Sequence, residues 1–209
     1  MAARRSPTES AGRVSGSVVL RPGRPTDIPA LRALEDRAFT YDRLSARSFA
    51  RFLHSPGASL IVAEASGLVC GYALTLFRKR SKVARLYSIA VDATLGRRKL
   101  GGRLLGAAEV AALRRRAKAM RLEVKPDNRH ALRLYGTFGY RVVRELGAYY
   151  DDGSKALRLE KALAVSKQPA FPDRSGSRRP RVTATVSLNS PPQPCGRRRD
   201  TLSPGSILR

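Results

Sequence analysis

Apolar residues recur with strand and helix periodicity in turn through the middle of the chain, and this alternation limits the fold more than any other feature. Strands are expected at residues 17–21, 59–65, 69–77, 84–91, 120–124, 140–144 and 156–161, and helices at 28–39, 45–53, 100–119 and 128–138. Thr26 and Asp27 offer a cap before the first helix, and Gly139 offers a stop after the last. Elements in this order predict the α/β class, with one central mixed sheet of six to seven strands and helices on both faces.

The two ends of the chain differ from this middle region in composition. Residues 1–17 are small and polar, and residues 163–209 are rich in Pro, Ser and Arg, with no apolar period in either segment. Segments that can bury so little apolar surface stay unfolded. We therefore expect a disordered N-terminal segment, a folded domain over residues 18–162 and a disordered basic tail.

The charge of the chain bears on its partners. The formal net charge is +25. An excess of this size favours contact with polyanions such as RNA, ribosomes or a phosphorylated cofactor. The alternative is an arginine-rich surface that is only solvated, and the sequence leaves both interpretations open.

Cysteine usage and hydropathy bear on the compartment. Cys70 lies in an apolar run, where a packed thiol is expected, and Cys195 lies far away in the tail. Two isolated cysteines build neither a disulfide framework nor a zinc site. No apolar run approaches the roughly 20 residues that span a bilayer. We expect a cytoplasmic protein with no membrane partner and no metal.

A glycine-rich turn joins the strand at 84–91 to the helix that follows it. Gly101 and Gly102 lie there beside Arg97, Arg98 and Lys99. The N–H groups at a helix start suit a diphosphate, glycines let it come close, and the cations attract it. The chain has neither a P-loop pattern nor a GxGxxG pattern. The alternative interpretation is a glycine turn before an ordinary helix with a solvated basic end.

A second segment, RLEVKPDNRHALRLYGTFGY, places polar residues among apolar ones. Glu123 lies in an apolar strand, Asn128 opens the next helix, and Tyr135 lies two turns further along that helix. Taken alone, such a Glu usually faces solvent, and such a Tyr usually belongs to the core or its rim.

Together, the two segments resemble the GNAT superfamily of N-acetyltransferases, and the second is similar to its ribosomal-protein-alanine N-acetyltransferase branch. The matching residues, at the family's spacing, are Leu122, Glu123, Val124, Asn128, Ala131, Leu134, Tyr135, Gly139 and Tyr140. The likeness covers nearly all of residues 18–162. It implies a GNAT-like fold and an enzyme that transfers acetyl from acetyl-CoA, as cosubstrate, to an amine. The cofactor turn departs from the family pattern, since Gly96 and Lys99 occupy two of its three signature positions.

The same resemblance implies a role for each site residue. Glu123 takes the proton that an ammonium must lose before it can attack, and Tyr135 gives a proton to the departing thiolate. A backbone N–H of the fourth strand donates to the thioester oxygen. The implied cofactor contacts are Ile89, Ala90, Val91, Arg97, Arg98, Lys99, Leu100, Gly101, Gly102 and Asn128.

The acceptor is less constrained than the reaction. The branch implies the α-amine at a protein N-terminus, on a ribosomal protein or one like it. A lysine side chain or a small-molecule amine is an alternative. So is a GNAT-fold module without activity that binds RNA or ribosomes through its basic surface. The presence of both Glu123 and Tyr135 favours the enzyme.

The composition of the tail predicts the result of removing it. A chain truncated after Ser166 should keep its melting temperature and its affinity for acetyl-CoA, because a Pro- and Arg-rich tail packs on nothing. Any association with RNA or ribosomes at low salt should weaken, because the tail carries many cations. Thermal unfolding and sedimentation with ribosomes measure the two effects. A large loss of stability would place the tail within the fold.

Overall fold

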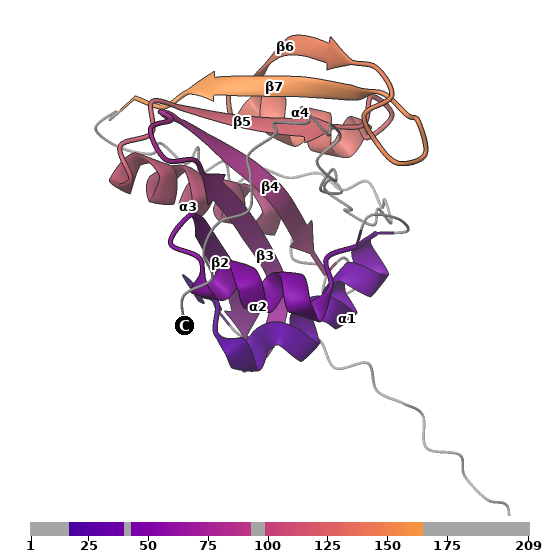
Figure 1. Cartoon of the computed structure of the whole chain (residues 1–209). Helices are drawn as coiled ribbons and strands as arrows, with labels where there is room; N and C mark the ends of the chain where they lie inside the picture. Colours follow the sequence, from indigo (N-terminus) through magenta and orange to yellow (C-terminus); the bar gives the residue numbers. More distant parts are fainter. Residues whose placement is uncertain (1–16, 40–42, 93–98, 165–209) are drawn as a thin grey trace, which may run out of the picture.

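A computed structural model of the chain describes residues 17–39, 43–92 and 99–164, and Figure 1 shows their arrangement. The strands are β1 (Val18–Pro22), β2 (Ala58–Ala65), β3 (Leu68–Phe77), β4 (Val83–Val91), β5 (Ala119–Val124), β6 (Arg141–Leu146) and β7 (Ala156–Ala162). The helices are a 3₁₀ turn η1 (Pro25–Asp27), α1 (Ile28–Ala38), α2 (Ala46–His54), α3 (Leu100–Arg114) and α4 (Arg129–Thr137). Every strand and helix expected from periodicity is present.

The strands form one seven-stranded sheet in the order β1-β2-β3-β4-β5-β7-β6. All neighbours are antiparallel except β4 and β5, which are parallel. The α/β class and the mixed sheet predicted from the sequence are therefore confirmed. The strand β7 lies between β5 and β6, so the last hairpin inserts its second strand next to β5.

The parallel pair β4 and β5 stays together over a short distance only. Val83 to Arg85 pair with Ala119 to Arg121, and no further pairs follow. Figure 1 shows the two strands starting together and then running apart. A β-bulge lies in β4 just beyond the paired residues, because Leu86 faces Thr75 while Ser88 faces Leu74, which leaves Tyr87 without an opposite residue. Bulges bend the strand that carries them.

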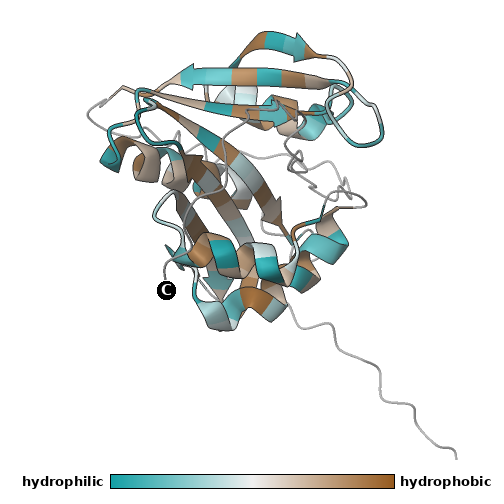
Figure 2. Cartoon of the chain, viewed as in Figure 1, coloured by the Kyte–Doolittle hydropathy of each residue, from teal (hydrophilic) through white to brown (hydrophobic). Residues whose placement is uncertain are grey.

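Two apolar cores lie on opposite faces of the sheet. On one face α1 and α2 pack against β2, β3 and β4, with Leu31, Phe49 and Tyr72 fully buried. On the other face α3 packs against the same strands, and its core continues to Tyr135 of α4 and Leu122 of β5. Figure 2 shows the apolar residues concentrated on the central strands and on the inner sides of the helices. Helices on both faces were expected, and the two cores confirm this.

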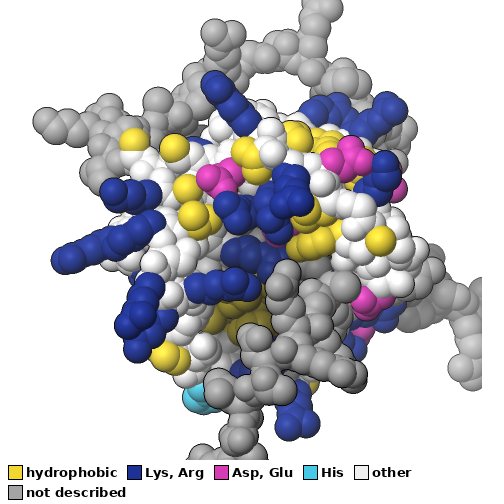
Figure 3. Space-filling view, turned by 45° about the horizontal axis from the view of Figure 1, so that its top comes forward, with side chains coloured by type: hydrophobic (Ala, Val, Ile, Leu, Met, Phe, Trp, Pro, Cys, Tyr) yellow, Lys and Arg dark blue, Asp and Glu magenta, His cyan; other side chains and the backbone are white. Residues whose placement is uncertain are grey.

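The half of the sheet formed by β5, β7 and β6 carries charged side chains on the α1/α2 side. Arg85, Arg121, Glu123 and Arg158 lie on this side, because Tyr87, two residues after Arg85, contacts Phe52 of α2. In Figure 3, which brings the β6 and β7 region forward, Lys and Arg side chains gather in the middle of the view. These charged side chains therefore gather here, outside the two apolar cores.

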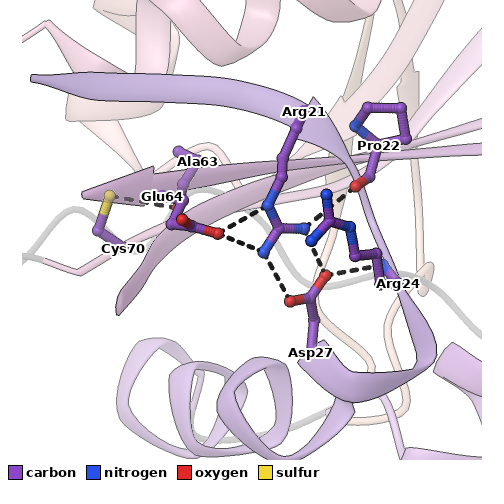
Figure 4. A network of polar contacts seen from close by, with 7 residues as sticks. All are labelled: Arg21, Pro22, Arg24, Asp27, Ala63, Glu64 and Cys70. Atoms are coloured by element: carbon purple, nitrogen blue, oxygen red, sulfur yellow. Dashed lines mark hydrogen bonds and ion pairs between the residues drawn. The ribbon is translucent and has the colours of Figure 1, made fainter. Parts of the chain in front are cut away.

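Asp27 does not cap α1 as the sequence suggested. Its carboxylate accepts from Arg21 of β1 at 2.7 and 2.8 Å and from the N–H of Arg24 at 2.7 Å, and no side-chain cap bond is made to α1 (Figure 4). Arg21 also donates to Glu64 of β2 at 2.7 Å. The carboxylate therefore serves a cation that ties β1, β2 and η1 together, which competes with capping for the same oxygens.

The helix after the glycine turn ends earlier than predicted. It stops at Arg114, where Arg116 takes a left-handed backbone with φ of 59°. The N–H of Ala117 bonds to the carbonyl of Ala112, and that of Arg116 to Leu113, as in a Schellman motif. The prediction overran because this stop uses Arg, whereas Gly139, with φ of 85°, ends α4 as expected.

The limits of the domain stay a prediction. The expected disordered segments, residues 1–17 and 163–209, lie almost wholly outside the described residues. Among the described residues, no helix combines the length and the apolar character needed to cross a bilayer.

Two glycines, one tightly packed between β3 and β4 and one in open space on α4, give a matched test of this packing. A Cβ at Gly71 would lie 2.9 Å from the carbonyl oxygen of Ala90 and 3.0 Å from Leu104, so Gly71→Ala should destabilise the fold by roughly 1–3 kcal/mol. A Cβ at Gly136 in α4 would meet nothing within 4 Å, so Gly136→Ala should stabilise it by about 0.5–1 kcal/mol. Denaturant unfolding measures both. Equal effects of the two substitutions would contradict the packing described for β3 and β4.

Candidate active site

The separation of β4 from β5 leaves one edge of β4 without a strand partner among the described residues. Past the bulge, the N–H of Asp92 bonds to the carbonyl of Cys70 at 3.0 Å. Main-chain groups alternate in direction along a strand, so the N–H groups of Ile89 and Val91 point away from β3, toward the β5 side. The side chains of Ile89 and Ala90 are fully buried in the two cores. These main-chain donors are fixed in place and are suited to meet an oxygen that gains charge.

Glu123 lies at the point where β4 leaves β5. It lies two positions after Arg121, the last residue of β5 that pairs with β4, and its side chain is 2% exposed. Its two oxygens accept from the Nε atoms of Arg85 at 2.9 Å and of Arg158 at 2.8 Å. A buried carboxylate needs such partners, because isolated charge is costly to bury. The carboxylate is thus held between cations from β4 and β7, rather than facing bulk solvent.

Tyr149, in the loop between β6 and β7, belongs to the same cluster. Its hydroxyl accepts from Arg85 Nη2 at 2.7 Å. Burial raises the pKa of this phenol well above its usual range, and the nearby Glu123 carboxylate raises it further. Tyr149 therefore stays protonated at neutral pH and presents a hydroxyl beside Glu123.

The start of α3 presents main-chain donors. The first bond within the helix runs from the N–H of Arg103 to the carbonyl of Lys99, so the N–H groups of Leu100, Gly101 and Gly102 have no partner inside the helix. Lys99 itself has a left-handed backbone with φ of 73° and an exposed side chain. The Leu100 side chain is buried. These groups can hold an anion through the main chain.

Gly102, which the sequence analysis expected to contact the cofactor, has a packing role in the structure. A Cβ there would lie 3.1 Å from the ring of Phe138. The glycine therefore lets α3 approach the end of α4 closely. Arg97 and Arg98, also expected to contact the cofactor, lie outside the described residues, as does Gly96.

Asn128 and Tyr135 lie on α4. The side chain of Asn128 accepts from the N–H of Ala131 at 3.0 Å, which caps the helix as the sequence predicted. Tyr135 is fully buried, with its ring centroid 5.8 Å from that of Tyr140. Burial raises the pKa of Tyr135 well above its usual range, so its hydroxyl is protonated at neutral pH. A catalytic or cofactor role for either residue stays a proposal.

The sequence analysis missed a buried carboxyl on α1. Glu35 is fully buried and binds the hydroxyl of Tyr72, while its second oxygen accepts from the N–H of Leu44 at 2.7 Å. The hydroxyl of Tyr72 lies 2.6 Å from Ser88 Oγ on β4. Burial raises the pKa of Glu35 to about 7. Through Leu44 and Ser88, the network ties α1 to the end of the loop before α2 and to β4 next to Ile89.

Signals for the missed residues were present but weak. Arg85 is a cation inside an apolar strand, and Glu35 is an acid at a core-facing helix position after Leu31 and Leu34. Either could have been identified from its place on an apolar face. In the part of the chain that the structure describes, no group of three or more His, Cys, Asp or Glu side chains could hold a metal ion.

Comparison with known proteins identifies the fold and the family. The acetyltransferase (GNAT) family model matches residues 28–140. No curated protein matches the sequence. The ribosomal-protein-S18-alanine N-acetyltransferase from Escherichia coli is 24% identical with a TM-score of 0.64, and the match covers 74% of this chain and 99% of that one. Ard1 from Thermoplasma volcanium is 24% identical with a TM-score of 0.65, over 70% and 98% of the two chains. Nourseothricin acetyltransferase is 23% identical with a TM-score of 0.59, over 70% and 99%.

The raised pKa of Glu35 predicts a pH dependence of stability. A glutamate in the unfolded chain titrates near 4.3, so between about pH 4.5 and 7 the folded state binds more protons than the unfolded state. The contribution of Glu35 is therefore complete below this range, and it is lost as pH rises through about 7. Denaturant unfolding across the range should show that Glu35→Gln removes this fall. The exposed Glu145→Gln is the control and should keep the wild-type dependence. A pH-independent difference between wild type and Glu35→Gln would contradict the assignment.

Proposed function

This chain belongs to the acetyltransferase (GNAT) family, and we propose that it acetylates the α-amine at the N-terminus of a protein. The observation that carries the proposal is the position of Glu123, a buried carboxylate on β5 at the point where β4 leaves that strand. The fold also resembles that of a ribosomal-protein-S18-alanine N-acetyltransferase. A ribosomal protein, or a protein like it, is therefore the proposed acceptor.

The described residues fit acetyl-CoA as cosubstrate. When bound, it supplies the acetyl group as a thioester. The N–H groups of Leu100, Gly101 and Gly102 would hold its diphosphate, with Lys99, Arg97, Arg98 and Asn128 as further proposed contacts. The N–H groups of Ile89 and Val91, in the segment that includes Ala90, would donate to the thioester oxygen, which gains charge as the amine attacks.

Glu123 would accept the proton of the acceptor amine. An ammonium has no lone pair, so it must lose a proton first, directly or through a water molecule. Both carboxylate oxygens already accept from arginine Nε atoms, and each has a second lone pair for a further donor. Arg85 and Arg158 thus fix the direction from which a proton can arrive.

Tyr135 would supply the proton that the departing thiolate needs. Its pKa is raised by burial, so the proton is present at any pH near neutrality. The hydroxyl can donate a hydrogen bond to the sulfur as negative charge develops and can then transfer the proton.

The deciding experiment must distinguish a protein N-terminus from other amine acceptors. Lysine side chains and small-molecule amines are alternatives, and nourseothricin acetyltransferase shares the fold. Purified protein should be incubated with labelled acetyl-CoA, a ribosomal extract and a set of free amines, followed by mass spectrometry of acetylated peptides. Label at protein N-termini supports the proposal. Label confined to lysine side chains or free amines overturns it.

Substitution of the two proposed catalytic groups should separate turnover from binding. Glu123→Gln and Tyr135→Phe should each lower kcat by about 10- to 10⁴-fold, because general acid–base catalysis contributes in this range. The affinity for acetyl-CoA, measured by calorimetry, should change little. Glu160→Gln and Tyr140→Phe are the matched controls, since Glu160 lies on the same face and Tyr140 packs beside Tyr135. Near-normal kcat in both Glu123→Gln and Tyr135→Phe would show that the roles are misassigned.

A further inference from the structure

Five arginines lie on the α1/α2 side of the sheet, at the start of β4 and on β5, β7 and β6, beyond the part that α1 and α2 cover. This arginine face consists of Arg85, Arg121, Arg141, Arg144 and Arg158, with Glu123 and Glu160 as its carboxylates. The arginines form rows across the strands. Arg144 of β6 faces Arg158 of β7, which faces Glu123 of β5. Five arginines against two glutamates leave a net positive charge on this face, and Figure 3 shows Lys and Arg side chains gathered in the region of β6 and β7.

The arginines of this face differ in how far they are paired. Arg85 and Arg158 give their Nε atoms to Glu123, yet their side chains remain 30% and 26% exposed. Arg121 pairs with Glu160 at 2.7 Å. Arg141 and Arg144 are exposed and form no ion pair with any described residue. Like charges placed opposite each other, such as Arg144 and Arg158, repel unless an anion lies between them.

The width of the face matches a short peptide. From Glu123 on β5 across β7 to Arg144 on β6 there are two strand spacings of about 4.8 Å, or about 10 Å. An extended chain advances about 3.3 Å per residue, so about three residues beyond the first cross this distance. An acceptor with its α-amine at Glu123 would then place its next residues over Arg158 and Arg144 as it runs toward β6.

We propose that the arginine face recognises an acidic N-terminal segment, so that the preferred acceptor carries Asp or Glu at the second to fourth positions after its α-amine. This inference rests on the proposed function, whose acceptor it narrows. The free guanidinium groups of Arg141 and Arg144, with the exposed ends of Arg85 and Arg158, bind the carboxylates. Charge complementarity of this kind sets specificity and the rate of encounter.

The test compares peptides that share a first residue and differ only at positions two to four, with acidic, neutral or basic residues there. Wild type should have the highest kcat/KM for the acidic peptide, and the difference should shrink as salt is added. Arg144→Gln and Arg141→Gln should each lower kcat/KM for the acidic peptide by about threefold to fivefold, the size expected for exposed ion pairs. Both should leave kcat/KM for the neutral peptide unchanged.

The controls separate this inference from the function on which it rests. Arg114→Gln removes an exposed arginine from α3, on the opposite side of the sheet, and should change nothing. Thermal unfolding should show that all three variants fold. Equal rates with acidic and neutral peptides, or a preference for the basic one, would overturn the inference while leaving N-terminal acetylation intact. Acetylation of no peptide at all would instead refute the proposed function.

A nucleic acid is the competing occupant, and the same variants address it. An RNA oligonucleotide that binds wild type and loses affinity in Arg144→Gln, with no preference among the peptides, would assign the face to RNA and overturn the inference. If acidic peptide is preferred and the Arg144→Gln change leaves RNA affinity unaltered, the face belongs to the acceptor.

Discussion

The parting of β4 from β5 is the constraint on which the rest of the site depends. Only three residues of each strand pair, and the bulge at Tyr87 then bends β4 away. This one irregularity leaves the N–H groups of Ile89 and Val91 without a strand partner among the described residues, while both side chains stay in one core. Each strand keeps its other neighbour, since β4 pairs with β3 and β5 pairs with β7, and these pairings hold the two separated strands in place. Strand pairing on both sides makes this region rigid, and the short gap in the pairing between β4 and β5 leaves main-chain N–H groups available as donors.

Two buried carboxyl groups near this opening are stabilised in opposite ways. Glu123 is held by two guanidinium groups, which come from β4 and β7 and therefore bridge the strands on either side of β5. Glu35 forms no ion pair with any residue that the structure describes and instead binds a phenol and a backbone N–H, and burial raises its pKa to about 7. The first arrangement fixes the Glu123 carboxylate in position between β4 and β7. The second favours a neutral group that holds α1 and β4 together.

The sequence predicted the elements well because each is set by local periodicity, and it predicted Glu123 and Tyr135 only through a family resemblance. The stop of α4 at Gly139 was visible, since glycine there has a direct reason, whereas the stop of α3 at Arg116 was not. Asp27 was misjudged because its partner, Arg21, lies on β1, outside the helix that Asp27 precedes. Glu35, Arg85 and Arg158 were missed for the same reason, since their roles exist only once distant strands and helices meet.

The starts of the helices show how a fold keeps donors for a ligand. Ser45 caps α2 and Asn128 caps α4 with their own side chains, each of which contributes about 1 kcal/mol to a helix. At the start of α3 the Lys99 side chain makes no cap bond, and its left-handed backbone costs about 1–2 kcal/mol. Packing holds this helix instead, through buried Leu100 and the contact of Gly102 with Phe138. A capping side chain would occupy the very N–H groups that an anion needs. A phosphate bound at this helix start would complete the cap, and the stability that α3 forgoes there would then contribute to binding.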